Sequence, residues 1–284
     1  MIAIDGAGAV VLASGERCDP TALLPQAKTR KYMSAQDEMA VVAAARAIAD
    51  ADLGSGPLGA RVGLYLMVGY IPFEYDDIAR VVEASSEGSA FSLSRFTRQG
   101  WQRARPLVAF RCLPNMPAFH VSAAFGIEGP CVVLYPGSGQ FYLALDAALE
   151  ALERGEIDRA LVGAVTHQRN FLVEHHFARV DPPLAPERLG NAAAFLVVSR
   201  SADAQVTRLS SEVKYRAHDP RRETVAPEES WKIDPPLETS RLDLGCASLP
   251  VALASAVDRG GTFTLEHRVR TRDGIEASSR WSAR

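Results

Sequence analysis

The sequence predicts an α/β fold, in which buried strands alternate with amphipathic helices. Three short apolar runs rich in branched residues, bounded by glycine or proline, read as strands: residues 62–68 (VGLYLMV), 131–135 (CVVLY) and 160–165 (ALVGAV). A stretch with helical spacing of apolar residues separates the last two runs, beginning at Gln140 and ending before Gly155. Strand, tight turn, helix and strand in this order form a βαβ unit, whose turn lies at the carboxyl edge of a sheet.

The composition is that of a globular protein. The chain has 284 residues, of which 47% are hydrophobic and 23% charged, so it could form one large domain or two small ones. A net charge of −3 argues against a dedicated nucleic-acid binder. No apolar run is long enough to cross a bilayer and no signal peptide is visible, so a cytoplasmic location is expected.

The cysteines give no sign of a metal site. Cys18, Cys112, Cys131 and Cys246 are scattered without the spacing of metal ligands, and they are interpreted as buried thiols. The adjacent His175 and His176 would point about 100° apart on a helix, which makes chelation of one ion difficult. We therefore expect no metal and no cofactor.

The N-terminal elements follow from apolar runs and helix signals. Residues 1–11 are apolar with glycines and predict an edge strand. Ser34 and Asp37 resemble a capping box, and good helix formers continue from there to Asp52. Residues 62–68 then predict a central strand, and residues 192–198 another buried strand.

The C-terminal part differs in composition. Residues 201–241 are rich in charge and proline and predict long loops or a covering flap. A short apolar helix is expected at about residues 247–257. Residues 262–270 alternate between apolar and polar, and the dipeptide Asp273 and Gly274 predicts a hairpin turn before a return strand at residues 275–281.

The turn at residues 136–139 (PGSG) is where a nucleophile would be expected. Backbone N–H groups at the start of the following helix would stabilise a thiolate or an oxyanion. None of the usual strong nucleophiles is present, because Pro136 occupies the apex and the nearest hydroxyl belongs to Ser138.

Several stretches, in consistent order over roughly residues 1–200, resemble the β-ketoacyl synthases of fatty-acid and polyketide assembly. They are residues 31–34 (KYMS) with the helix that follows, 113–122 (LPNMPAFHVS), 125–130 (FGIEGP), the turn that ends in Ser138 and Gly139, and 188–195 (RLGNAAAF). The resemblance implies a thiolase-like layered fold. Residues 1–200 would form one complete αβ half, and residues 201–284 a truncated second half with a flap, a short helix and a terminal β-hairpin.

The resemblance also implies that the catalytic residues are missing. The family carries an acyl-accepting cysteine at the position that this chain fills with Pro136, and two histidines in its second half. No histidine–glycine–threonine stretch follows residue 200, and residues 244–249 (LGCASL) have no histidine where the family would have one. Covalent condensation needs an activated nucleophile, which proline cannot be. We therefore expect no catalytic residue in the degenerate turn Pro136, Gly137, Ser138 and Gly139, and no condensation by this chain alone.

A ketosynthase relative without the cysteine resembles a chain-length factor. Such subunits of type II polyketide systems pair with an active β-ketoacyl synthase and shape the acyl tunnel at the dimer interface. Pro136 and the shortened second half imply a compact subgroup, such as those of aryl-polyene pathways. The implied partners are an active ketosynthase, in a heterodimer, and an acyl carrier protein, with no nucleic acid and no membrane.

Candidate contact residues follow from the same resemblance. The acyl tunnel would be lined by Leu113, Met116, Phe119, Tyr135 and Phe141, although the first three suit an ordinary core equally well. A basic stretch offers either a carrier-protein contact or an ordinary solvated surface, through Arg95, Arg98, Arg103 and Arg105. His120 does not match a catalytic histidine of the family and is interpreted as a structural, hydrogen-bonded residue.

Two other functions stay open. The chain could be a diverged acyltransferase or thioesterase that uses Ser138, although residues 136–140 (PGSGQ) depart from the Gly-x-Ser-x-Gly elbow and no base is placed beside the serine. It could also be a carrier-protein docking scaffold without chemistry. In any of these roles, a chain lacking most of one half must cover the exposed apolar surface or leave a patch that invites association.

Overall fold

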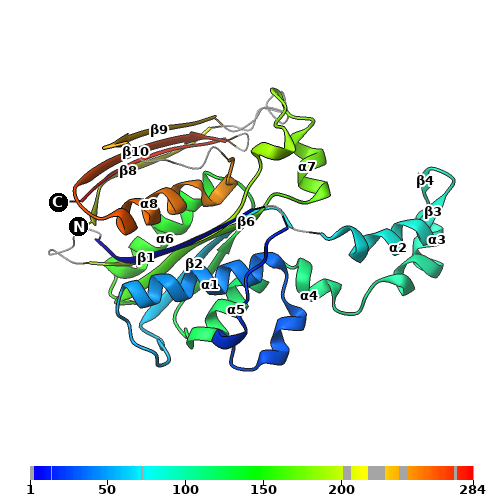
Figure 1. Cartoon of the computed structure of the whole chain (residues 1–284), viewed down its shortest axis with the longest axis horizontal. Coiled ribbons are helices and arrows are strands. Elements are labelled where there is room, and N and C mark those ends of the chain that lie inside the picture. The colour runs from blue at the N-terminus through cyan, green and yellow to red at the C-terminus, as the bar shows by residue number, and fades with distance from the viewer. Residues whose placement is uncertain are drawn as a thin grey trace.

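The computed structural model describes residues 3–13, 15–71, 73–200, 206–216, 228–236, 242–271 and 274–283. Nine of its eleven described strands form one sheet in the order β5-β2-β6-β7-β1-β8-β11-β10-β9, and the other two form a separate pair. The sheet folds over between β1 and β8, which share only two residue pairs, and its two parts enclose a layer of helices (Figure 1). No helix in the described ranges is long and apolar enough to cross a membrane.

The N-terminal part of the sheet is the centre of the fold. It consists of β5 (Cys131–Leu134), β2 (Val62–Val68), β6 (Arg159–His167), β7 (Asn191–Ser199) and β1 (Ala3–Leu12). Strand β2 pairs in parallel with β5 and β6, whereas β7 runs antiparallel to β6 and β1. Helices cover both faces, which explains why β2, β6 and β7 read as continuous apolar runs.

Two helical layers flank these strands. Helices α1 (Ala35–Asp50) and α5 (Met116–Phe125) cover one face, and α6 (Gln140–Glu153) and α8 (Ser248–Arg259) cover the other (Figure 1). The predicted capping box starts α1: the Asp37 N–H donates to Ser34 Oγ at 3.3 Å, and the Ser34 N–H donates to Asp37 Oδ2 at 2.5 Å. The predicted helices at Gln140 and near residue 247 are also confirmed.

The C-terminal part of the sheet covers α6 and α8 from the other side. Its strands β8 (Val206–Tyr215), β11 (Ile275–Ala283), β10 (Phe263–Arg270) and β9 (Glu228–Asp234) are all antiparallel. Alternate side chains such as Leu265 and Trp281 point inward and are fully buried, whereas the outer face is charged, with an Arg280–Glu266 ion pair at 3.3 Å. This outer face is polar and needs no further helical layer to cover it. The order of layers is therefore helices, sheet, helices, sheet.

Three expectations about strands were wrong. The N-terminal strand β1 is central, because β8 pairs with its far edge. Strand β5 lies at the edge of the sheet and is only partly covered, because β2 is its one neighbour among the described strands. Residues 206–215 and 228–234, expected in loops, are strands; their charged residues Glu212, Lys214, Glu228 and Lys232 are exposed, whereas Glu229 faces inward. The return strand was predicted correctly; Asp273 of the expected turn lies outside the described residues.

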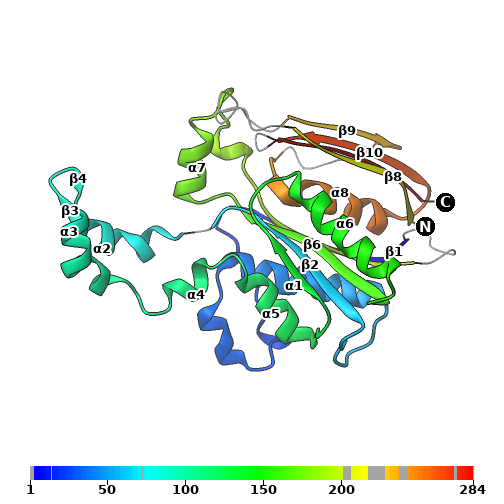
Figure 2. The same ribbon diagram turned by 180° about the vertical axis from the view of Figure 1, so that it is seen from behind.

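Residues 75–103 form an arm that projects from the body (Figure 2). The arm contains α2 (Tyr75–Ser85), the two-stranded pair β3 (Ser86–Glu87) and β4 (Ala90–Phe91), α3 (Leu93–Arg95), a π-helical turn η3 (Phe96–Gly100) and η4 (Trp101–Arg103). At its base, the buried carboxylate of Asp77 forms ion pairs with Arg105 at 3.4 Å and Arg111 at 3.1 Å. These ion pairs attach the arm to the segment that leads back to the body.

Short helices complete the chain. They are η1 (Thr21–Leu23), η2 (Ala27–Tyr32), α4 (Val108–Cys112), α7 (Phe171–Phe177), η5 (Pro186–Arg188) and η7 (Gly245–Ala247). Helix α7 lies above the carboxyl ends of β2 and β6, next to the predicted functional turn (Figure 1).

Candidate functional site

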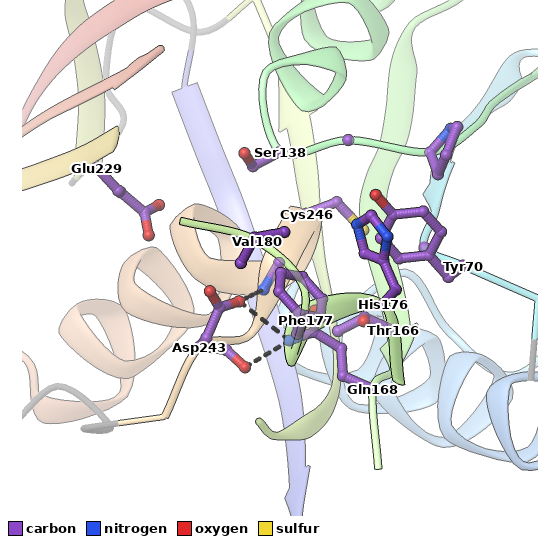
Figure 3. A pocket seen from close by; sticks show the side chains of 14 residues that line it. Tyr70, Ser138, Thr166, Gln168, His176, Phe177, Val180, Glu229, Asp243 and Cys246 are labelled. Carbon is purple, nitrogen blue, oxygen red and sulfur yellow. Dashed lines mark hydrogen bonds between the residues drawn. The ribbon is translucent and has the colours of Figure 1, made fainter. Parts of the chain in front are cut away.

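The turn between β5 and α6 lines a cavity of about 190 Å³ (Figure 3). Pro136, Gly137 and Ser138 form one wall. The opposite walls come from the ends of β2 and β6, from α7, from β9 and from the loop before α8, and include Tyr70, Gln168, His176, Glu229 and Asp243. Segments far apart in the sequence therefore meet at the carboxyl edge of the parallel strands, as the βαβ pattern predicts.

The turn packs tightly against the C-terminal strands. A Cβ atom on Gly139 would lie 2.8 Å from a side-chain carbon of Ile275, so only glycine fits there without a shift. The hydroxyl oxygen of Ser138 is buried and has no hydrogen-bond partner in the described part of the chain. Because no histidine or carboxylate is hydrogen-bonded to it, Ser138 is not activated as a nucleophile in this geometry.

A polar brace forms another wall of the cavity. Nε2 of Gln168 donates to Oδ1 of Asp243 at 3.0 Å and to its backbone oxygen at 2.5 Å. The same Oδ1 accepts the N–H of Gly245 at 2.8 Å. These bonds fix the loop that precedes α8 against the end of β6 (Figure 3).

Glu229 connects the cavity wall to a buried hydrogen-bond network. Its Oε1 lies 2.7 Å from Nε2 of His267, whose Nδ1 lies 2.7 Å from the hydroxyl of Tyr142. The Tyr142 hydroxyl in turn lies 3.0 Å from Oγ of Ser279, which accepts the indole N–H of Trp281. A neutral His267 satisfies every member: its Nε2–H donates to Glu229 and its Nδ1 accepts from Tyr142.

The network is structural in character. Burial raises the pKa of the Tyr142 phenol well above its usual value, so the hydroxyl stays protonated. The sequence analysis did not identify this network. The alternation of residues 262–270 placed His267 on the inward face, but nothing in the sequence indicated that Tyr142 and Glu229 would meet it.

The charges of the cavity are negative. Glu229 and Asp243 contribute carboxylates, and the described lining residues include no lysine or arginine. The buried Cys246 supplies no nucleophile, because burial raises the pKa of its thiol to about 12 and its sulfur donates to the Val165 carbonyl. An anionic ligand would therefore be repelled without a compensating cation.

The other cysteines differ from expectation. Cys131 is exposed because β5 is an edge strand, and Cys18 and Cys112 are only partly buried. Burial still raises the pKa of the Cys112 thiol, to about 11. In the described part of the chain, no group of three or more histidine, cysteine or acidic side chains could hold a metal ion.

The predicted tunnel residues are not brought together. Met116 and Phe119 line a separate groove between η2, α4 and α5, with Leu113 half-exposed nearby. Tyr135 is 38% exposed beside the turn. Phe141 belongs to the core on the α6 face of the sheet and lines neither cavity.

The remaining predicted residues lie on the arm and in helix α5. Arg98 and Arg103 are exposed and form no ion pair with described residues, whereas Arg105 pairs with Asp77 and Arg95 is partly buried. His120 is 1% exposed, which fits the expected structural residue, but its Nε2 atom has no partner in the described ranges, so the expected hydrogen bond is not found at that nitrogen.

The chain is similar to known proteins in sequence and in fold. The family model described as β-ketoacyl synthase, N-terminal domain, matches residues 3–202. No curated protein matches the chain significantly.

Three solved structures resemble the whole chain. One is described as a type II polyketide synthase acyl-carrier protein in complex with its ketosynthase bound to the hexaketide (AntDE:AntF); it shares 15% identity at a TM-score of 0.69, covering 100% of this chain and 99% of that one. The ishigamide ketosynthase/chain length factor shares 16% identity at a TM-score of 0.64, covering 99% of each chain. A β-ketoacyl synthase from Burkholderia phymatum STM815 shares 13% identity at a TM-score of 0.64, covering 100% of this chain and 99% of that one. The fold is therefore the thiolase-like layered α/β fold expected from the sequence.

Proposed function

This chain belongs to the β-ketoacyl synthase family, and from that premise we propose that it is a non-catalytic, chain-length-factor-like subunit that pairs with an active β-ketoacyl synthase and shapes its acyl tunnel. The observation that carries the proposal is the turn at the cavity. Its residues Pro136, Gly137 and Ser138 include no cysteine, and no base is hydrogen-bonded to the serine. Loss of one member of a catalytic set usually lowers the rate by several orders of magnitude.

The charge of the cavity supports the same proposal. Ketosynthases of this family decarboxylate a malonyl donor, which carries a carboxylate. Glu229 and Asp243 in the cavity wall would repel that group, and no lysine or arginine among the described lining residues offsets them. The cavity is therefore unsuited to the donor as well as to the acyl acceptor.

Edge strand β5 supports pairing with a second subunit. Among the described strands it bonds to β2 alone, so its other side presents a free edge that a strand of another subunit could use. The arm adds exposed apolar side chains of the kind that interfaces bury: Tyr75, Phe91, Leu93 and Trp101. A ketosynthase/chain length factor is also among the similar structures.

We assign further contacts within the proposed complex. Leu113, Met116, Phe119 and Tyr135 would contact the acyl chain, and Phe141 would support α6 from the core. Arg95, Arg98, Arg103 and Arg105 on and beside the arm would attract an acidic carrier protein, the kind of partner named for one similar structure. Residues 1–200 and 201–284 would correspond to the family's two halves. Pro136 in place of the family's cysteine favours a subgroup such as that of aryl-polyene pathways in the cytoplasm.

A second candidate is acyl transfer or thioester hydrolysis at Ser138. The observation in its favour is that Ser138 lines the cavity two residues before α6 begins. Labelling by an acyl-thioester analogue tests it directly. Covalent labelling of the chain that is lost in a Ser138→Ala variant would support this candidate, and an unlabelled chain would exclude it.

Co-expression with candidate ketosynthases tests the pairing. We expect the tagged chain to retain an active ketosynthase through affinity purification and size-exclusion chromatography, at the mass of a one-to-one complex. A chain that elutes as a monomer beside a fully assembled ketosynthase homodimer would contradict the proposal.

A further inference from the structure

A second hollow lies between η2, α4 and α5, apart from the cavity at the turn. It is a groove of about 590 Å³, and it shares no lining residue with that cavity. Its walls are apolar and consist of Tyr32, Leu107, Phe110, Met116 and Phe119. The rings of Tyr32 and Phe110 meet edge to face at 5.7 Å and join η2 to α4 at one side. A volume of this size is within the usual range of small-molecule sites.

His120 is the unusual residue of the groove. It lines the groove, yet its side chain is almost completely buried and its Nε2 atom has no hydrogen-bond partner in the described part of the chain. Burial lowers the pKa of the imidazole to about 4, so the ring is uncharged at neutral pH. Buried polar atoms without a partner are rare, because each is unfavourable by about 1–3 kcal/mol. A ligand in the groove would supply the missing partner.

The remaining lining limits the charge of such a ligand. The described residues of the groove include no lysine, arginine, aspartate or glutamate, and the hydroxyl groups of Thr29 and Tyr32 are the other polar groups among them. A carboxylate or phosphate would therefore be buried without a counter-charge, which is strongly unfavourable. An aliphatic chain suits the walls, and a single neutral polar group suits His120.

We propose that this groove binds an uncharged amphiphile, an aliphatic chain with one hydroxyl or carbonyl group that hydrogen-bonds to Nε2 of His120. A neutral imidazole can accept from a hydroxyl or donate to a carbonyl, depending on its tautomer. The inference deepens the proposed function and rests on it in one respect, because Met116 and Phe119 are among the proposed acyl contacts. It concerns this chain alone and does not require the partner.

Competition between matched ten-carbon ligands tests the inference on the purified full chain. The neutral dye Nile red reports occupancy of the groove by its fluorescence, and 1-decanol, 2-decanone and decanoate compete with it. We expect the alcohol and the ketone to displace the dye at concentrations about ten-fold lower than decanoate, because only decanoate carries an unpaired charge into the groove.

Variants at His120 separate the hydrogen bond from simple apolar binding. His120→Phe keeps the size of the side chain but removes the hydrogen bond to the ligand. We expect this variant to bind 1-decanol about three- to ten-fold more weakly. His120→Gln restores a hydrogen-bonding group and should recover part of the loss. His175→Phe, at an exposed histidine of α7, is the matched control and should change nothing.

The imidazole itself gives a second readout. In wild-type chain with ¹⁵N-labelled histidine, 1-decanol should shift the ring nitrogen resonances of His120 and leave those of His175 in place. Equal competition by decanoate, unchanged binding in a folded His120→Phe variant, or no shift at His120 would each overturn the inference. Failure to pair with a ketosynthase would overturn only the proposed function, because these measurements omit the partner.

Discussion

Nε2 of His267 on β10 lies 2.7 Å from Oε1 of Glu229 on β9, and this contact joins the wall of the cavity to the core. The imidazole ring also packs 4.1 Å from the ring of Trp231. Through Tyr142, the same histidine reaches the first turn of α6, which starts directly after the degenerate turn. The C-terminal sheet therefore holds the turn at residues 136–139 in place.

Tyr142→Phe should destabilise the chain by about 1–3 kcal/mol, because it leaves Nδ1 of His267 without its hydrogen-bond partner in the core and removes the contact with Ser279. Urea unfolding followed by circular dichroism measures the change. Tyr135→Phe, at a half-exposed tyrosine, is the control and should have almost no effect. Equal stability of the two variants would show that the network contributes little.

The stability of the chain should depend on pH through two buried histidines and one carboxyl. Burial lowers the pKa of His120 and His167 to about 4 from the usual value of about 6.5, so the unfolded chain binds two more protons between these values. Burial raises the pKa of Asp37 to about 7 from 3.8, so the folded chain there binds one more proton. The histidine contributions are lost as pH falls toward 4, whereas the Asp37 contribution is lost as pH rises toward 7.

The two histidines and Asp37 together leave the unfolded chain with one more bound proton than the folded chain. The free energy of unfolding should therefore rise by about 1.4 kcal/mol per pH unit between pH 4.5 and 6. Asp37→Asn should make this slope about twice as steep, and His167→Gln should bring it close to zero. Urea titrations at several pH values measure the slopes. Identical slopes in wild type and in both variants would contradict the assignment.

Asp77→Asn should loosen the arm. The variant removes the carboxylate that pairs with Arg105 and Arg111, and since those guanidinium groups are partly exposed, we expect a loss of about 1–2 kcal/mol at most. Trypsin should then cleave within residues 75–103 faster than in wild type. Asp76→Asn, at the exposed neighbouring position, should leave the cleavage rate unchanged. Faster cleavage in both variants would point to a general effect of α2.

Trp101→Ala should weaken the pairing with the ketosynthase without affecting folding. The indole is 67% exposed in this chain, so its truncation removes little from the core, whereas a buried interface tryptophan contributes about 2 kcal/mol or more, or about 30-fold in affinity. Tyr215→Ala on β8, at a 70% exposed aromatic away from the arm, is the matched control. Surface plasmon resonance should show weaker binding to the ketosynthase for Trp101→Ala than for Tyr215→Ala. Equal affinity of the two variants would show that the arm is not part of the interface.

The first half of the fold could be predicted from the sequence because its signals are local. Apolar runs marked β2, β6 and β7, and a capping box marked the start of α1 at Ser34. The order of the strands in the sheet was harder to predict. Strand β1 is central and β5 lies at an edge, and this order depends on pairing between distant segments. Strands β8 and β9 were missed because their many polar and charged residues resemble loop composition.

The site was predicted in part for the same reason. The turn at Pro136 and Ser138 is a local pattern, and it does line the cavity. Glu229 and Asp243 were not foreseen, because they reach the cavity from segments about a hundred residues away that carry no motif. Phe141 was placed in a tunnel by resemblance, but its position on α6 buries it in the core.

Condensation by reconstituted proteins tests the central claim most directly. The chain, the partner ketosynthase, and the two together are each incubated with malonyl carrier protein and an acyl primer, and product length is read by mass spectrometry. We predict no product from the chain alone, extended product from the complex, and complete loss of product when the partner's cysteine is replaced by alanine. Chain extension by this polypeptide in the absence of any partner would contradict the account.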